Sequence, residues 1–280
     1  MLAVARVTQR ADAEHPVIDE VADEDGVPVG VWVWRQRLKQ TLDVAVNVTD
    51  DEHGQFAGRH ATILERKVME LVVIGGGQVG VYHARQLLKS VPRAQVTVVD
   101  RDPSCPAFVD LGSSIRPVVM EWLPFLRTWL LAGGDEDRLV PAPIAPHLTW
   151  EWLGLELGAE PVDPPRSWGL PYEQPGRGRE LFLSAAAWRC PATCIEPAHC
   201  PMLHAPRDWD LGDIIEARAQ SLGYVPSVLR CLHFAGGVGA ISVGDLRAAR
   251  DRLRSAPAGA VALVALSSRC HAAVGALGLG

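Results

Sequence analysis

The sequence predicts an α/β fold with a doubly wound, mostly parallel sheet, in which a second α/β half carries a cysteine-rich loop. Three observations lead to this prediction. Short, wholly apolar runs alternate with segments whose apolar residues repeat at helical spacing, as expected for buried strands and the helices that cover them. A glycine turn, GGGQVG, follows one such run at residues 75–80. Three cysteines fall within residues 190–200.

The composition limits the kind of protein this can be. The chain has 280 residues, of which 48% are hydrophobic, enough for one large domain or two modest ones. Its net charge of −6 gives no basic face for nucleic acid. No stretch approaches the roughly 18 to 20 apolar residues of a membrane span, and charges interrupt the N-terminus where a signal peptide needs an apolar core. We expect a cytoplasmic protein without membrane insertion, a small-molecule substrate or effector as its partner, and assembly into a homo-oligomer.

Three regions are predicted along the chain. Residues 1–68 form an N-terminal extension with two acidic runs and two candidate strands, VPVGVWVW and TLDVAVNV. This extension is either a small β-rich piece or an appendage upstream of a functional start at Met69. Residues 69–158 form the first α/β half, and residues 159–280 form the second.

The first half is expected to alternate strictly between strands and helices. Its predicted strands are residues 71–75, 94–100 and 137–143, and its predicted helices are residues 78–90, 117–132 and 146–157. Pro124 would kink the second helix. Residues 159–178, rich in Pro and Gly, are expected to be a loop.

The second half is expected to continue the same alternation. Its predicted strands are residues 179–188, 225–234 and 259–268, and its predicted helices are residues 208–222 and 243–255. Strands that alternate with helices in this way favour a mostly parallel sheet. A second glycine-rich turn, Gly236, Gly237 and Gly239, follows a strand and is either an anion-binding nest or a plain loop.

The first glycine turn matches G-x-G-x-x-G at Gly75, Gly77 and Gly80, between a strand and a helix. In such a turn the first Gly makes the bend, the second lets a pyrophosphate approach, and the third lets helix and strand pack closely. The N–H groups at the helix start then hold the phosphate. Asp100 ends the next strand, where a carboxylate accepts hydrogen bonds from ribose hydroxyls and favours NAD over NADP. Arg101, directly after it, weakens that preference.

The segment VVIGGGQVGVYHARQLLKSVPRAQVTVVDRDP resembles the NAD(P)-binding Rossmann family, in particular the nucleotide-binding modules of dehydrogenases and of potassium-uptake regulatory subunits. The resemblance covers residues 69–103. It implies a Rossmann-like domain over residues 69–158, with NAD or NADP bound at Gly75, Gly77, Gly80 and Asp100. The triple glycine also occurs in FAD-binding proteins of this fold, so a flavoprotein is a third alternative.

The cysteine-rich loop has the spacing C-x3-C-x5-C at Cys190, Cys194 and Cys200, which fits none of the common zinc or ferredoxin patterns. Cytoplasmic thiols stay reduced, so ligands, catalysts or buried residues are more plausible than disulfides. Three thiols on a short, proline-stiffened loop can converge on one point. Soft thiolates select zinc, iron–sulfur clusters or copper(I). A redox-active cysteine without metal and inert buried thiols remain as alternatives.

A fourth ligand is expected at the carboxyl ends of the strands, because ligands of open α/β sheets bind there. The candidates at this edge are Cys231, His233, Cys270 and His271. Glu196, inside the loop, and His233 are the candidate catalytic residues, which would relay a proton.

The first functional hypothesis is an NAD(P)-binding oxidoreductase-like enzyme with a cysteine-ligated zinc or iron–sulfur centre near the dinucleotide. This hypothesis requires that the thiols and the glycine turn open onto a common edge of one sheet. The alternative is an NAD-sensing regulatory module, similar to the potassium-uptake subunits, with a structural or redox-sensing cysteine loop.

Overall fold

The computed structural model describes residues 68–141, 147–191 and 193–280. Its contacts separate Met1–Lys67 from one compact unit, Val68–Gly280. The predicted N-terminal extension and its two candidate strands lie outside the described residues. No helix in the described part of the chain is long and apolar enough to cross a membrane.

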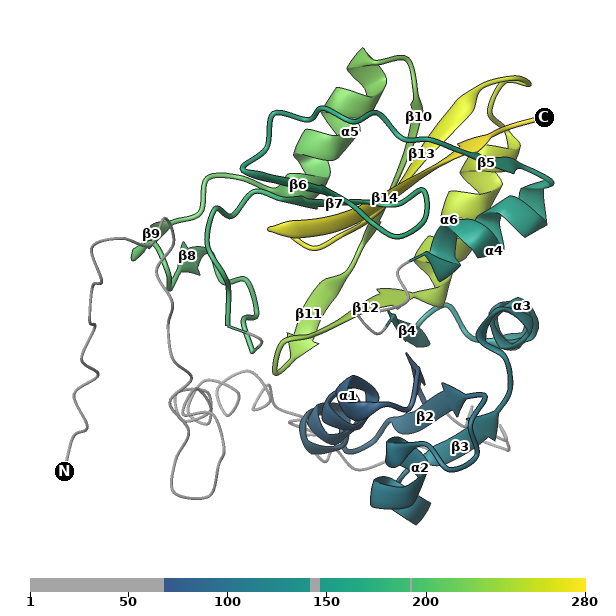
Figure 1. Cartoon of the computed structure of the whole chain (residues 1–280). Helices are drawn as coiled ribbons and strands as arrows, with labels where there is room; N and C mark the ends of the chain where they lie inside the picture. Colours follow the sequence, from purple (N-terminus) through teal and green to yellow (C-terminus); the bar gives the residue numbers. More distant parts are fainter. Residues whose placement is uncertain (1–67, 142–146, 192) are drawn as a thin grey trace, which may run out of the picture. The chain divides into compact units, whose positions relative to one another are not determined.

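The first sheet contains the glycine turn and has six strands (Figure 1). In their order across the sheet, these are β3 (Arg116–Val119), β2 (Gln95–Asp100), β1 (Glu70–Ile74), β4 (Arg138–Pro141), β12 (Val238–Ser242) and β11 (Leu232–Ala235). The first four strands are parallel. Strands β2 and β3 are added on one side of β1, and β4 is added on its other side. The last two form a hairpin that adds antiparallel to β4.

The second sheet is built around the C-terminal strands. In order, it contains β10 (Val225–Arg230), β13 (Val261–Ser267), β14 (His271–Gly278), β7 (Leu181–Ser184) and β6 (Tyr172–Pro175), and β5 (Glu160–Val162) also pairs with β14. Only β10 and β13 are parallel among the pairs of this sheet. A short separate pair, β8 (His199–Cys200) and β9 (Ala205–Pro206), lies in the cysteine loop.

The α/β class and the interleaving of strands with helices are confirmed, but the prediction of one mostly parallel sheet is wrong. Both sheets are mixed. The reason is the length of the connections, because a parallel pair needs a crossover of about a dozen residues or more, whereas a short turn forces an antiparallel hairpin. Only residues 268–270 join β13 to β14, so these two strands are antiparallel. The sequence analysis does not predict β14. Gly236 and Gly237 join β11 to β12.

The helices occupy three separate layers. They are α1 (Gln78–Ser90), α2 (Pro106–Leu111), the short 3₁₀ helix η1 (Gly112–Ser114), α3 (Trp122–Ala132), α4 (Leu148–Leu157), α5 (Leu211–Ser221) and α6 (Val243–Arg254). The helix predicted over 117–132 is therefore a strand followed by a shorter helix. Pro124 is the third residue of α3, where its missing N–H has no partner to lose, so it causes no kink.

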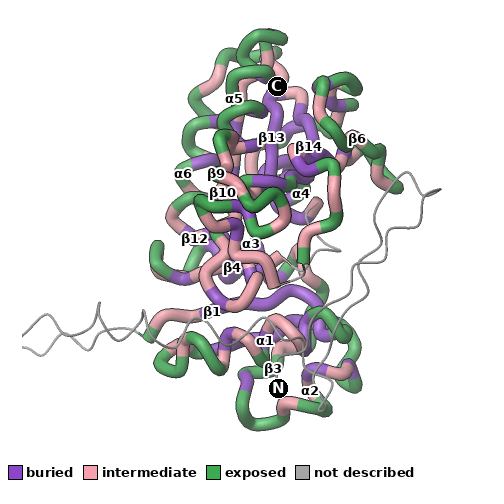
Figure 2. The backbone as a smooth tube through the Cα atoms, turned by 90° about the vertical axis from the view of Figure 1, so that its left-hand side faces the viewer, coloured by how far each residue is buried: buried purple, intermediate pink, exposed green. Residues whose placement is uncertain are grey.

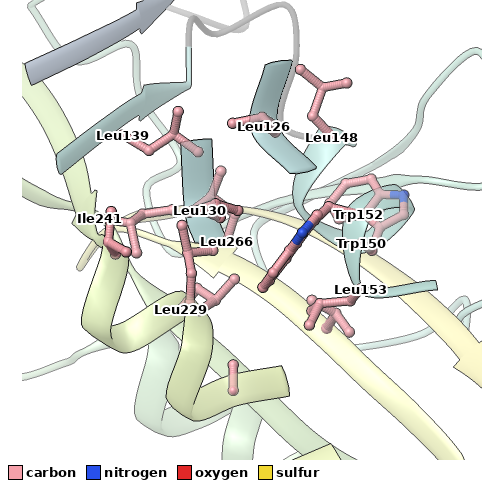
Figure 3. Packing of buried hydrophobic residues seen from close by; sticks show 14 of the residues in the cluster. Leu126, Leu130, Leu139, Leu148, Trp150, Trp152, Leu153, Leu229, Ile241 and Leu266 are labelled. Atoms are coloured by element: carbon pink, nitrogen blue, oxygen red, sulfur yellow. The ribbon is translucent and has the colours of Figure 1, made fainter. Parts of the chain in front are cut away.

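The core alternates between the two faces of each sheet. Leu71 and Val73 of β1 pack with α1 and α2, whereas Val72 and Ile74 face a cluster shared with α3, α4 and α6. The same cluster includes Val264 of β13, so these three helices lie between the two sheets. Helix α5 covers the other face of the second sheet. Figure 2 shows the buried strands at the centre of the described unit, and Figure 3 shows the packing of this shared cluster.

Candidate functional site

The glycine turn has the stereochemistry that the motif predicts. Gly75 has a φ of +91°, a conformation that favours glycine. A Cβ at Gly80 would stand 1.9 Å from the carbonyl oxygen of Gly75, so only glycine allows α1 to approach β1 this closely. Gly77, which precedes the first residue of α1, has no heavy atom of the described residues within 4 Å of the place of a Cβ. The protein therefore leaves no room for a side chain at Gly80, whereas the space next to Gly77 is open.

Asp100 ends β2 beside this turn. One carboxylate oxygen accepts a hydrogen bond from the N–H of Gly76 at 2.6 Å, and the other accepts one from the N–H of Asp102 at 2.9 Å. The side chain thus fixes the loops that follow β1 and β2 relative to each other. Each oxygen retains a lone pair for a further donor.

Cys105 supports the glycine turn from behind, a role that the sequence reading had missed. Its sulfur lies 2.2 Å from the place that a Cβ of Gly76 would take, and it is 3% exposed. The N–H of Ala107 donates to the carbonyl of Gly76 at 2.8 Å. Burial raises the pKa of the Cys105 thiol. Cys105 is a packing residue, and Gly76 is glycine because this sulfur occupies the space.

The cysteine loop begins six residues after β7 ends. Cys190 and Cys194 lie close together, and the Cys190 thiol donates a hydrogen bond to the Cys194 sulfur. This bond, together with the N–H of Glu196 at 3.4 Å, lowers the pKa of Cys194 to about 6, while the pKa of Cys190 is raised. Cys200 lies in β8 and is buried.

Glu196 holds the cysteine loop against the turn between β13 and β14. The residue is 8% exposed, and its carboxylate accepts hydrogen bonds from the Ser268 hydroxyl at 2.6 Å, the Arg269 N–H at 2.7 Å and the Cys270 N–H at 3.2 Å. The structure gives this candidate catalytic residue a positioning role, since its oxygens already have three donors. Its φ of +52° lies in the left-handed region, which residues other than glycine rarely adopt.

Cys270 contacts the cysteine loop through this turn, and Cys231 lies at the end of β13, where its N–H donates to the carbonyl of Ser267 at 2.8 Å. The pKa of Cys270 is raised to about 11 by burial and by the charge of Glu196, with a smaller contribution from Cys194. Cys231 also lies beside His233. Its sulfur and the His233 Nε2 stand 2.6 and 3.2 Å from the place of a Cβ on Gly239. Burial raises the pKa of Cys231 to about 12.

His233 connects the two sheets. It lies in β11 and pairs with Gly239 of β12. Gly239 comes two residues before Ile241, which pairs with Leu139 of β4. This register places His233 level with the carboxyl ends of β1 and β4, at the edge where the glycine turn begins. Its Nδ1 contacts the carbonyl oxygen of Cys194 at 2.9 Å. His233 therefore brings the cysteine loop to the edge of the first sheet.

Two further histidines lie near His233. Burial, with the charge of His233 second, lowers the pKa of His83 in α1 to about 4. The Nδ1 atom of His83 is buried and has no hydrogen-bond partner among the described residues. Loss of solvent around the ring and the charge of His233 also lower the pKa of His271, against an opposing effect of Glu196. No local motif marks His83, so the sequence reading had missed it.

A cavity of about 480 Å³ lies between the cysteine loop and the ends of β10 and β13. Its lining includes Glu196, Cys231 and His233, and the start of α5. Arg230 closes one side, where its guanidinium pairs with Asp210 and with Asp213. Asp210 also caps α5 by accepting from the N–H of Gly212 at 3.0 Å. The cavity follows the carboxyl ends of two parallel strands, the usual place for a ligand in such a sheet.

The predicted common edge is thus only partly realised. The glycine turn and the cysteine loop belong to different sheets, contrary to the expectation of one sheet, and His233 forms the contact between them. Within the described residues, no three His, Cys, Asp or Glu side chains stand in positions that could hold a single metal ion. The second glycine-rich turn is a plain hairpin turn, since Gly236 and Gly237 have φ values of +53° and +83°, typical of a tight β-hairpin.

Comparison with known families places one match on the second half. Residues 146–280 match a family described as the C-terminal domain of an uncharacterized protein. This region includes the cysteine loop, His233 and Cys270, and it excludes the glycine turn. No curated protein matches the chain.

Proposed function

We propose that this protein binds an NAD-type dinucleotide at the β1–α1 turn and acts as an NAD(P)-dependent oxidoreductase. The observation that carries the proposal is the packing of the turn. Gly80 is forced to be glycine by the carbonyl of Gly75, whereas Gly77 is open. Packing inside the protein accounts for Gly80, whereas a pyrophosphate approaching the backbone would account for glycine at the open position of Gly77.

The order of the parallel strands supports the same proposal. The order β3-β2-β1-β4 across the sheet, with reversal next to β1, matches the first four strands of the Rossmann order. The glycine turn starts at that reversal, where ligands of open α/β sheets bind. In this proposal, the N–H groups at the start of α1 face the pyrophosphate.

The roles of the neighbouring residues follow from their positions. Asp100 uses its remaining lone pairs to accept hydrogen bonds from ribose hydroxyls. A nicotinamide ring would supply hydride chemistry when bound. His233 lies at the same edge and is oriented by Cys194. Because a carbonyl oxygen only accepts, the Nδ1 of neutral His233 carries its proton, which leaves Nε2 able to take a proton from a substrate.

A binding experiment with two variants tests this proposal. The full chain is titrated with NADH, and the transfer of excitation from tryptophan to the nicotinamide is measured. Gly77→Val places a side chain in open space, so it should fold normally and bind NADH at least tenfold more weakly. Lys89→Ala, an exposed change in the last turn of α1, is the matched control and should bind as the wild type does. Equal affinity of Gly77→Val and wild type, or no binding of NADH or NADPH to either, would exclude the proposal.

A further inference from the structure

We propose that the cavity beside the cysteine loop binds a small hydroxy acid, that is, an aliphatic carboxylate with a hydroxyl group, and that Arg269 anchors its carboxylate. The inference rests on the proposed function, since it names the substrate class of that oxidoreductase. Binding of the acid is nevertheless measurable without the dinucleotide.

The cavity has the size and the position of a small-molecule site. Its volume of about 480 Å³ falls within the range of roughly 300 to 1,000 Å³ that is usual for such sites. It follows the carboxyl ends of β10 and β13, the parallel pair of the second sheet. Ile195 and Pro197 of the cysteine loop and Leu232 of β11 give its wall apolar surface, which suits a short aliphatic chain.

The carboxylates that line the cavity already have donors. Glu196 accepts three hydrogen bonds from the turn between β13 and β14. Asp210 accepts from the N–H of Gly212 and pairs with Arg230, which also pairs with Asp213. A Cβ on Gly212 would stand 2.0 Å from Nη1 of Arg230, so glycine at this position lets the guanidinium lie against the first turn of α5. The charge of Arg230 is therefore used within the protein.

Arg269, in contrast, has hydrogen-bonding capacity left for a ligand. Its N–H donates to Glu196 at 2.7 Å and its carbonyl oxygen accepts from the N–H of Leu211 at 2.9 Å, so its backbone is fixed on both sides. Its Nε lies 4.0 Å from Asp210, and its two Nη groups donate no hydrogen bond to any residue that the structure describes. The side chain is 52% exposed, so a ligand can reach it. A guanidinium with free N–H groups matches a carboxylate, which it binds through two parallel hydrogen bonds.

His233 requires a donor on the same ligand. Its Nδ1 contacts the carbonyl oxygen of Cys194, so Nε2 of the neutral ring is an acceptor. This Nε2 has no hydrogen-bond partner within the described part of the chain, and it lies beside the Cys231 sulfur, close to Gly239. A hydroxyl group can donate to Nε2, whereas a carboxylate cannot. Together, Arg269 and His233 select an acid that also carries a hydroxyl.

The position of His233 also relates this ligand to the dinucleotide. His233 lines the cavity and, through the register of β11, β12 and β4, lies level with the carboxyl ends of β1 and β4. In the proposed function, the carbon that bears the hydroxyl passes a hydride to NAD⁺, and the hydroxyl proton passes to Nε2. The products are a carbonyl compound, NADH and a protonated His233.

Isothermal titration calorimetry of the full chain with hydroxybutyrates tests the inference. The 2-, 3- and 4-hydroxy isomers differ in the distance between the hydroxyl and the carboxylate. We expect at least one of them to bind about fivefold more tightly than butyrate, which lacks the hydroxyl, and about tenfold more tightly than its own amide. Arg269→Gln should weaken its binding about tenfold. Arg218→Gln, which removes the same charge from an exposed position of α5, is the matched control and should bind as the wild type does.

The same titrations contain the results that would overturn the inference. Equal affinity of the acid and its amide for the wild type, or of wild type and Arg269→Gln for the acid, would exclude Arg269 as the anchor of a carboxylate. Tighter binding of 4-amino-1-butanol than of any acid would show a site for cations and exclude the ligand class. Failure of all three acids to bind at about 10 mM, a concentration that populates even weak complexes, would exclude it as well.

NADH titration and circular dichroism of each sample separate this inference from the proposed function and from a loss of folding. Intact NADH binding without binding of the acids overturns the substrate class alone. Binding of an acid to a folded protein that binds neither NADH nor NADPH would exclude the oxidoreductase and leave the cavity as a carboxylate site.

Discussion

The imidazole of His233 contacts the carbonyl oxygen of Cys194 at 2.9 Å, and this contact joins the edge of the first sheet to the cysteine loop. The contact brings the cysteine loop to the edge of the first sheet at which the glycine turn begins. Figure 1 shows the β11–β12 hairpin, which carries His233, extending from the second half toward α1. Tyr82 of α1 donates to the carbonyl of Gly236 at 3.0 Å and fixes the hairpin there.

Replacing His233 by Phe should release the cysteine loop from the first sheet. The variant keeps a ring of similar size but loses the hydrogen bond, which is worth about 1 kcal/mol. We expect faster amide exchange in residues 193–196 and a small loss of global stability. Hydrogen exchange followed by mass spectrometry measures both effects. Unchanged exchange in the loop would show that His233 does not hold it.

Replacing Glu196 by Gln should destabilise the protein by about 2 kcal/mol, because a buried carboxylate that accepts three hydrogen bonds becomes an amide with one acceptor. The midpoint of urea unfolding is the appropriate measurement. Glu216→Gln, an exposed change in α5, is the control and should alter stability by less than about 0.5 kcal/mol. If both variants unfold at the same urea concentration, Glu196 does not anchor the β13–β14 turn.

Replacing Gly80 by Ala should cost at least about 2 kcal/mol, since the new Cβ would stand 1.9 Å from a backbone oxygen and α1 would have to move away from β1. Gly77→Ala is the matched comparison at the same turn, where a Cβ meets open space. Thermal unfolding of the two variants should separate them clearly. A Gly80→Ala protein as stable as Gly77→Ala would contradict the close packing described here.

Acid should destabilise the protein through His83. Its folded pKa of about 4 lies below the ordinary value of 6.5. The unfolded chain therefore binds the proton first, and the folded state loses stability as the pH falls from about 6.5 to 4. Partial exposure of the ring reduces the effect, which we expect to be about 2 kcal/mol. His83→Gln should have a flatter stability profile than wild type over this pH range in urea unfolding, and parallel profiles would refute the effect.

The fold could be predicted from the sequence wherever one local pattern determined the structure. The helix over residues 78–90 begins and ends as predicted, because the apolar spacing and the glycine turn both specify it. Strand β14 was missed, since Gly275 interrupts its pattern of β-favouring residues. That glycine is required by the core, because a Cβ there would stand 2.8 Å from the Trp150 ring.

Local sequence patterns indicated individual candidate site residues but not how the fold arranges them. Glycine spacing identified Gly75, Gly77 and Gly80, and the density of cysteines identified the loop. Which thiols lie together depends on the antiparallel β13–β14 turn, which brings Cys270 beside Glu196. Cys231 lines the cavity beside Glu196 because the chain passes from one sheet to the other between Arg230 and Leu232. Neither relationship leaves a signal in local sequence.

Hydrogen exchange at the glycine turn, measured with and without saturating NADH, tests the central claim most directly. In the proposal, the amides of residues 77–80 at the start of α1 contact the pyrophosphate, so they should exchange at least tenfold more slowly when NADH is present, with weaker protection around Asp100. Unchanged exchange at these amides in protein that demonstrably binds NADH would place the dinucleotide elsewhere and contradict the account.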